Sequence, residues 1–434
     1  MWPSESCSHG VRESTVNTGR ATSTALLAVA LLLLSSFVAS GEANAQSKNT
    51  CLDCHSNLDG PLQVTTEKFS ADIHAQKGLT CASCHGGDPT KDDADAMSKA
   101  AGFRGHIDRA QVPELCGKCH SDAAYIRQYN PSLRTDQLAQ YHTSKHGLLL
   151  AKGDTHVAVC IDCHSVHDLR PPSDPRSTVN PVNVAKTCST CHSDRDHMKA
   201  YNIKTDQFAG YSGSVHYEAL AQRGDLSAPT CTTCHGNHGA APPGVASVEN
   251  VCATCHVFQA QLFDGSPHKA AFNASGLPGC ITCHSNHRIQ HTGDSMIGTG
   301  PQAVCTNCHS KGDAGFAAAD AMSRQLITLE MALVKSEDIL QHAEQSGMEV
   351  GQAKLDLTQG RDSLTKSRVT IHSFAPAKLD AEIKTALAIT DKTYTAGVTA
   401  LRERDFRRAG LGVSVLTIMV VLCGLFLTIR NMER

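Results

Sequence analysis

Nine copies of the pattern Cys-x-x-Cys-His occur in this 434-residue chain, and they constrain its fold more than any other feature. Two thiols at this spacing can add across the two vinyl groups of one haem, and the histidine that follows then falls beneath the iron as its proximal ligand. The pattern is typical of c-type haem attachment, so the sequence predicts nine covalently bound haems. Numbered along the chain as motifs 1 to 9, the cysteine pairs are Cys51 and Cys54, Cys81 and Cys84, Cys116 and Cys119, Cys160 and Cys163, Cys188 and Cys191, Cys231 and Cys234, Cys252 and Cys255, Cys280 and Cys283, and Cys305 and Cys308. The predicted proximal ligands are His55, His85, His120, His164, His192, His235, His256, His284 and His309.

Zinc sites and disulfides are the alternative interpretations of such cysteine pairs. Zinc sites also use Cys-x-x-Cys, but they do not need a histidine directly after the second cysteine. Histidine fills only 24 of 434 positions, yet it follows all nine pairs. Disulfides of this spacing are mostly redox-catalytic, and nine in one chain have no evident purpose. Haem is therefore the favoured reading, and the two remaining cysteines, Cys7 and Cys423, are expected to be inert.

Residues 1–45 have the layout of a secretory signal. Arg12 and Arg20 precede an apolar run over residues 25–39, and Ala43-Asn44-Ala45 supplies a small-x-small cleavage site. The basic part is long and weakly charged, so an uncleaved membrane anchor is the alternative. Export agrees with the motif count, because c-type haem is attached on the far side of the inner membrane.

A second apolar segment covers residues 409–429 and carries no charge. Its 21 residues are enough to cross a bilayer as a helix, so we expect one C-terminal transmembrane helix; a buried helix of a soluble domain is the alternative. Arginines flank both ends, which leaves the positive-inside rule silent. The haems therefore decide the orientation, with residues 46–408 on the periplasmic side of the inner membrane and residues 430–434 as a cytoplasmic tail.

Composition limits both the core and the partners. Aromatic residues make up only 4% of the chain, so nine porphyrins would form most of the interior of the motif region. The formal charge is -3, and haem propionates would add further negative charge. Nucleic-acid binding needs clustered lysine and arginine, so we expect no nucleic-acid partner.

The motif region contains an internal repeat. The stretches after Cys119 and Cys191 both read CHSD, then YN, then TDQ, and then a tyrosine before a Ser-x-His. The larger unit is a Ser-x-His, one haem motif and then a second haem motif. Three of the four first motifs extend to Cys-x-x-Cys-His-x-x-His. The chain therefore divides into one leading haem and four di-haem units.

The additional histidines of the repeat are candidates for the second axial ligand, because two imidazoles saturate a low-spin haem iron. The predicted distal ligands are His74, His106, His146, His167, His216, His238, His268 and His287. Eight candidates for nine haems leave one haem without a predicted second ligand. His142, His156, His197 and His291, and more weakly Met198 and Met296, are candidates for the ninth.

The predicted fold is mostly α-helical and irregular, with little sheet, because Gly, Pro and Ser interrupt the motif region throughout. Residues 46–312 form the predicted nonahaem domain. Residues 313–408 lack proline up to the break at Pro376 and are expected to form an antiparallel helical hairpin; a coiled-coil oligomerisation arm is the alternative. The stalk histidines, His342 and His372, are expected to be solvated.

Residues 51–309 resemble the membrane-anchored multihaem c-type cytochromes of bacterial respiration, through the nine motifs and the CHxxH extensions. The resemblance implies an electron relay between a membrane quinol or redox complex and periplasmic or outer-surface partners. It favours a non-catalytic carrier subunit over an enzyme. The C-terminal anchor departs from the N-terminally anchored quinol dehydrogenases, so a separate integral-membrane subunit is expected to oxidise quinol. The alternative is a multihaem reductase or oxidase of small nitrogen or sulfur oxyanions with one open-coordination haem.

Overall fold

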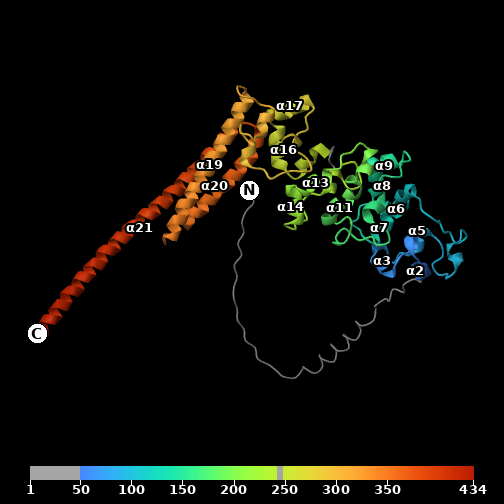
Figure 1. Cartoon of the computed structure of the whole chain (residues 1–434), viewed down its shortest axis with the longest axis horizontal. Helices are drawn as coiled ribbons and strands as arrows, with labels where there is room; N and C mark the ends of the chain where they lie inside the picture. Colours follow the sequence, from blue (N-terminus) through green and yellow to red (C-terminus); the bar gives the residue numbers. More distant parts are fainter. Residues whose placement is uncertain (1–48, 242–247) are drawn as a thin grey trace, which may run out of the picture.

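The computed structural model describes residues 49–241 and 248–434, and this part of the chain is helical, with no β-strand. The predicted signal therefore lies outside the described residues. Short helices of the motif region follow one another from α2 and α5 at one end to α16 and α17 at the other, where three long helices begin (Figure 1). The helical and irregular fold class predicted from the sequence is confirmed.

The motif region consists of short helices joined by loops. The α-helices are α2 (Thr50–His55), α3 (Thr66–Ser70), α4 (Ile73–Gln76), α5 (Cys81–His85), α6 (Val112–His120), α7 (Ala123–Arg127), α8 (Gln137–Thr143), α9 (Lys145–Leu150), α10 (Cys160–His164), α11 (Pro181–His192), α12 (Arg195–Lys199), α13 (Gln207–Ser212), α14 (Val215–Ala221), α15 (Cys231–His235), α16 (Val257–Asp264), α17 (Pro267–Ser275) and α18 (Ile281–His284). The 3₁₀ turns are η1 (Gly60–Leu62), η2 (Ala94–Met97), η3 (Arg109–Gln111), η4 (Val248–Thr254), η5 (Asp294–Met296) and η6 (Val304–Asn307).

The sequence repeat is also a repeat of hydrogen bonds. Tyr141 donates its hydroxyl to the carbonyl of Ala158 at 2.9 Å, and in the next unit Tyr211 donates to the carbonyl of Pro229 at 2.9 Å. Each acceptor stands two residues before a haem motif. The tyrosines thus tie each Ser-x-His segment to the motif that follows it.

After the motif region, the chain forms α19 (Ala314–Gln345), α20 (Gly351–Thr370), the turn η7 (Ile371–Ser373) and α21 (Pro376–Met432). The structure differs here from the predicted hairpin, because its first arm is split and folds back on itself. α19 ends at Gln345, and Gly347, two residues later, has a φ of +81°, the left-handed conformation that favours glycine. The amide of Met348 bonds the carbonyl of Ala343 at 3.0 Å, which completes a Schellman cap.

The three helices form one antiparallel bundle with a leucine-rich core. α19 contributes Leu326, Leu329 and Leu333, the stripe recognised in the sequence, and the first two are 0% exposed. Leu379 of α21 is also 0% exposed. The apolar stripe of α19 is therefore buried within one chain, which removes the main sequence argument for a coiled-coil oligomer.

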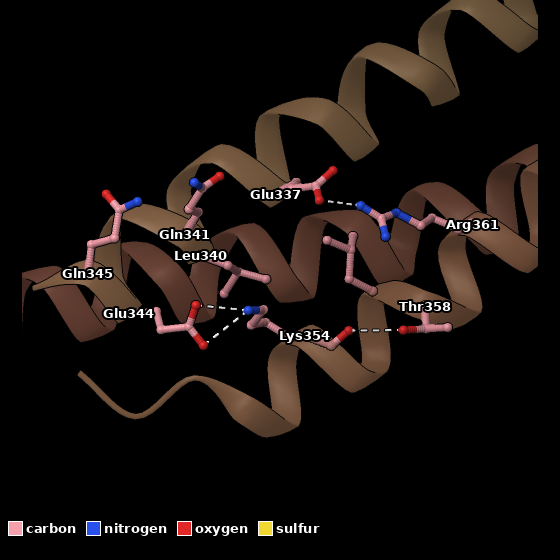
Figure 2. Close-up of a pocket in the computed structure, with 9 residues that line it drawn as sticks. Glu337, Leu340, Gln341, Glu344, Gln345, Lys354, Thr358 and Arg361 are labelled. Atoms are coloured by element: carbon pink, nitrogen blue, oxygen red, sulfur yellow. Dashed lines mark hydrogen bonds and ion pairs between the residues drawn. The ribbon is translucent and has the colours of Figure 1, made fainter. Parts of the chain in front are cut away.

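Ion pairs connect α19 to α20 at the end of the bundle remote from the motif region. Lys354 of α20 binds Glu344 of α19 at 2.8 Å, and Arg361 binds Glu337 (Figure 2). These side chains line a shallow groove whose floor includes Leu340. All four charged groups are about half exposed, so we assign each pair only a small contribution to stability.

The C-terminal part of α21 extends away from the bundle (Figure 1). Pro376 is its first residue, as predicted, and the helix continues without a break into the apolar segment over residues 409–429. This is the single described helix that is long and apolar enough to cross a membrane, with a mean hydropathy of 2.5 over 18 residues, none of them buried. It supports membrane anchoring of the chain.

Candidate haem-binding sites

Eight pairs of imidazole rings bring a predicted proximal histidine opposite a second histidine. The ring centres lie 5.9 to 6.4 Å apart in all eight pairs. In the order of motifs 2 to 9, the pairs are His85 with His167, His120 with His74, His164 with His238, His192 with His146, His235 with His287, His256 with His216, His284 with His372, and His309 with His268.

This separation fits one metal ion between each pair of rings. Metal–imidazole bonds are about 2.0–2.1 Å long and a ring centre lies roughly 1.1 Å behind its nitrogen, so opposed axial imidazoles have centres about 6.2 Å apart. Direct stacking of two rings would allow a closer approach than this. The residues present therefore fit eight haem irons with two histidine ligands each.

The odd-numbered motifs 3, 5, 7 and 9 receive the histidine of a Ser-x-His segment. The serine is the N-cap of a short helix: the hydroxyl of Ser144 accepts the amide of Gly147 at 3.0 Å, and that of Ser214 accepts the amide of Tyr217 at 3.2 Å. In the first unit the buried Asp72 does this, because its carboxylate accepts the amide of His74 at 2.8 Å. The spacing thus places the histidine in the first turn of a helix with a fixed N-terminus.

The even-numbered motifs 2, 4 and 6 receive the last histidine of a Cys-x-x-Cys-His-x-x-His sequence two motifs further on. In two of these sequences the backbone turns through the left-handed region. Ser165 and His167 have φ of 69° and 63°, and Ser285 and His287 have φ of 64° and 44°. Non-glycine residues in this region are strained, and such strain concentrates at functional sites. Here the turn directs the histidine away from its own motif and toward an earlier one.

Hydrogen bonds at Nδ1 fix the orientation of several rings. The Nδ1 atom of His55 lies 2.9 Å from the carbonyl oxygen of Leu62, and that of His372 lies 2.9 Å from the carbonyl oxygen of Val369. A carbonyl can only accept, so each Nδ1 carries the proton and Nε2 keeps a free lone pair. This is the tautomer that an imidazole needs in order to bind a metal through Nε2.

Burial keeps most of these imidazoles neutral, as iron ligation requires. It is the main cause that lowers the pKa of twelve paired histidines, and it lowers the pKa of His164 to about 4. The others are His85, His120, His146, His167, His192, His216, His235, His238, His268, His284 and His372.

The attachment cysteines show that successive motifs are neighbours in space. The first cysteine of each odd motif lies beside the first cysteine of the next even motif, close enough for that neighbour to raise the pKa of the odd-motif thiol: Cys51 with Cys81, Cys116 with Cys160, Cys188 with Cys231, and Cys252 with Cys280. The second cysteines lie within electrostatic range of each other at the alternate junctions: Cys84 with Cys119, Cys163 with Cys191, Cys234 with Cys255, and Cys283 with Cys308. The nine motifs therefore form one line in sequence order.

The structure does not bring the predicted ligand His106 to any proximal histidine among the described residues. Its side chain is 88% exposed and lies 3.9 Å from Asp108. The reserve candidates also have other neighbours: His142 lies 3.1 Å from Glu114, and the His291 ring lies 2.6 Å from Glu218. His156 lies 3.6 Å from Asp154, the His197 ring contacts Tyr201, Met198 is buried and Met296 lies in η5.

His372 corrects the expectation that both stalk histidines are solvated. His342 is exposed, but His372 is half-buried and stacks opposite His284, with ring centres 6.1 Å apart. Phe374, which follows the turn η7, packs on His268 with ring centres 3.9 Å apart. One sequence signal could have indicated His372: motif 8 is the last even motif, and no further CHxxH follows to supply its second histidine.

Comparison with known protein families agrees with this geometry. Residues 73–193 match the cytochrome c3 family model, and residues 33–86 match the model of cytochrome c554 and c-prime. The two matches support a multihaem electron-transfer cytochrome. They also imply that haem is bound covalently. No curated protein and no solved structure matches the chain.

Proposed function

We propose that the chain is an electron-transfer c-type cytochrome with nine covalent haems, which relays electrons between a membrane quinol-oxidising or other redox complex and periplasmic or outer-surface partners. The observation that carries the proposal is the line of nine motifs, in which a cysteine of each motif lies near a cysteine of the next. A relay needs a continuous line of redox centres, whereas an isolated catalytic site does not.

In this proposal the nine cysteine pairs attach the haems and the nine following histidines are the proximal ligands. The distal ligands are His74, His146, His167, His216, His238, His268, His287 and His372. His106 is replaced by His372. Each haem would supply one-electron ferric–ferrous chemistry, and the protein supplies spacing, axial ligands and burial. Two neutral imidazoles per iron favour a coordination that changes little between the two oxidation states.

The proposed topology places one end of the haem line beside the helical bundle that leads to the membrane anchor. Residues 1–45 are removed as a signal, residues 46–408 lie in the periplasm, residues 409–429 cross the inner membrane, and residues 430–434 form the cytoplasmic tail. Motifs 8 and 9 contact the bundle through His372 and Phe374, and motif 1 lies at the opposite end of the line. These haems lie at the start of α21, and residue 409, where the apolar segment begins, is about 50 Å further along that helix. We propose that an integral-membrane redox subunit reaches this end of the haem line, and that periplasmic redox proteins meet the other end.

Electrode voltammetry of the full-length holoprotein in lipid nanodiscs tests the relay. With haem 9, the haem of motif 9, facing the electrode, we expect about nine electrons per chain to transfer in the fast phase of the current. The double variant Cys188→Ser, Cys191→Ser removes haem 5 and should leave about four haems in the fast phase, because haems 1 to 4 lose their connection. The matched variant Cys51→Ser, Cys54→Ser removes a terminal haem and should leave about eight. If loss of haem 5 leaves about eight fast electrons, the linear relay is wrong.

A second function is a reductase or oxidase of small nitrogen or sulfur oxyanions. The observation that favours it is His55, the one proximal histidine that no ring in the described part of the chain opposes. Oxidation of reduced viologen by nitrite or sulfite, followed with catalytic amounts of the holoprotein, would separate the two functions. Sustained turnover indicates an enzyme, and its absence with intact voltammetry indicates a carrier.

A further inference from the structure

The eight histidine pairs obey one rule, and motif 1 is the exception to it. Odd motifs are opposed by a Ser-x-His or Asp-x-His histidine of their own unit, which precedes the motif by 36 to 42 positions. Even motifs are opposed by the CHxxH histidine two motifs later, or by His372 at the end of the line.

Motif 1 has the place of an odd motif. Its first cysteine, Cys51, contacts Cys81 of motif 2, as Cys116 contacts Cys160 and as the later odd motifs contact their successors. By the rule, its second histidine would come from a capped helix about 36 to 42 positions upstream, which falls on residues 9–15. Those residues belong to the predicted leader and precede its apolar run. His9, which lies in this range, would be lost with the leader.

The first di-haem unit also lacks one histidine of the repeat. Its CHxxH position holds Asp88 in place of a histidine. The rule assigns that histidine to an even motif two places earlier, and no such motif exists in the chain. Asp88 instead forms hydrogen bonds within its own loop. Its carboxylate accepts one from the amide of Thr90 at 3.0 Å and one from the hydroxyl of Thr90 at 2.6 Å. The repeat therefore begins half-way through a unit, with a haem motif but without its second histidine.

The proximal side of motif 1 is nevertheless complete. His55 is oriented by the carbonyl of Leu62, and α2 is fixed at its start because the amide of Thr50 donates to the carbonyl of Pro89 at 3.0 Å. The motif lies at the surface, since Cys54 is exposed and the neighbouring Leu58 and Leu62 side chains are 39% and 60% exposed. A histidine held in place for iron at an exposed motif, with no opposing imidazole ring among residues 49–241 and 248–434, is the arrangement of a ligand-binding haem.

We propose that the haem attached at Cys51 and Cys54 keeps its sixth coordination position for a small exogenous ligand, of the class of diatomic gases and small nitrogen oxides. The site lies at the end of the haem line remote from α21, so electrons that travel the whole line arrive at it. The inference rests on the proposed haem line and gives the second candidate function a definite location.

Carbon monoxide titration of the dithionite-reduced, full-length holoprotein tests the proposal. We expect one rapidly binding site per chain, with a change in about one-ninth of the haem absorbance, and one high-spin haem in the electron paramagnetic resonance spectrum of the oxidised protein. The variant Cys51→Ser, Cys54→Ser should lose one haem by mass and also lose the carbon monoxide site. The matched variant Cys305→Ser, Cys308→Ser should lose one haem from the other end and keep the site.

Three outcomes overturn the proposal. Nine low-spin haems without rapid carbon monoxide binding would mean that a histidine of a retained leader or of a second copy fills the position; the N-terminal mass and the concentration dependence separate these two sources. A site that persists in the Cys51→Ser, Cys54→Ser variant would place the open haem elsewhere. Fewer than nine haems in the mass of the unaltered protein would contradict the proposed nonahaem function itself, which is a distinguishable failure.

Discussion

Replacing His372 tests the least expected contact of the structure. In His372→Ala, the haem of motif 8 should lose its distal imidazole, because the His284 ring has no other histidine opposite it among the described residues. One haem should then change from six- to five-coordinate. Because the haem of motif 1 is proposed to be high-spin already, about one-eighth of the low-spin signal should be lost. The bond from the His372 ring to the Val369 carbonyl disappears as well, and its loss should lower the free energy of unfolding by about 1 kcal/mol.

The assay is again carbon monoxide binding to the reduced holoprotein, read together with the electron paramagnetic resonance spectrum of the oxidised form. The number of rapid binding sites should rise by one relative to the unaltered protein. His342→Ala is the matched control, because His342 lies on the same three-helix bundle but is exposed, and it should leave both spectra unchanged. His372→Met should keep six-coordination and shift one of the nine reduction potentials upward, since methionine in place of histidine raises the potential.

An unchanged count of binding sites in His372→Ala, with nine haems present by mass, would refute the assignment of His372. A bundle that unfolds in this variant would be visible as a loss of helical circular dichroism, and His372→Met then decides the question through the potential alone. Equal effects of His342→Ala and His372→Ala would also count against the assignment, because only one of the two rings faces a proximal histidine.

Four further outcomes follow from the structure. Gly347→Val should destabilise the bundle by roughly 1–2 kcal/mol in urea unfolding, because Gly347 has φ of +81°, whereas Gly351→Ala should have a small effect; equal losses would contradict the cap. Leu326→Ala, at a position 0% exposed, should lower the free energy of unfolding by about 2–5 kcal/mol, and the neighbouring Ile327→Ala, 45% exposed, by much less. Gly315→Ala should perturb the spectrum and potential of haem 9 selectively, because the added Cβ would lie 2.1 Å from Cε1 of His309; a spectrum identical to the unaltered protein would argue against this packing. Burial lowers the pKa of His164 from 6.5 to about 4, so the unfolded chain binds more protons than the folded chain below pH 6.5. The denaturant midpoint should therefore fall as the pH decreases from about 6.5 toward about 4. A midpoint independent of pH would contradict a buried, neutral His164 ring.

The repeat made most of the second histidines predictable from the sequence. The seven histidines proposed from Ser-x-His and CHxxH spacing, with Asp72 in place of the serine in the first unit, all lie opposite a proximal histidine. His106 was proposed from its position between two motifs, without a repeat to support it, and it lies in solvent. Spacing within a repeat is informative because equivalent residues receive equivalent hydrogen bonds, as the tyrosine contacts of two successive units show.

The position of His372 opposite His284 could not be predicted from the sequence, because it depends on how the three-helix bundle folds. On one continuous helix from Ala314, His372 would lie about 87 Å away along the axis, far from any haem motif. The left-handed turn at Gly347 reverses the chain instead, and α20 returns to the motif region. There Arg368 binds Asp294 at 2.8 Å just before the turn that carries His372.

The sequence by itself determined the attachment motifs, their repeat and the apolar C-terminal segment, because each of these is local: a few residues at fixed spacing, or one uninterrupted run, are sufficient. Only the tertiary structure decided which histidine faces which motif. A second axial ligand comes from 36 to 42 positions upstream, from two motifs downstream, or from the turn between α20 and α21, and its arrival depends on how distant segments pack. For the same reason the proposal of an open position at motif 1 depends on the other eight pairs, which only the tertiary structure shows.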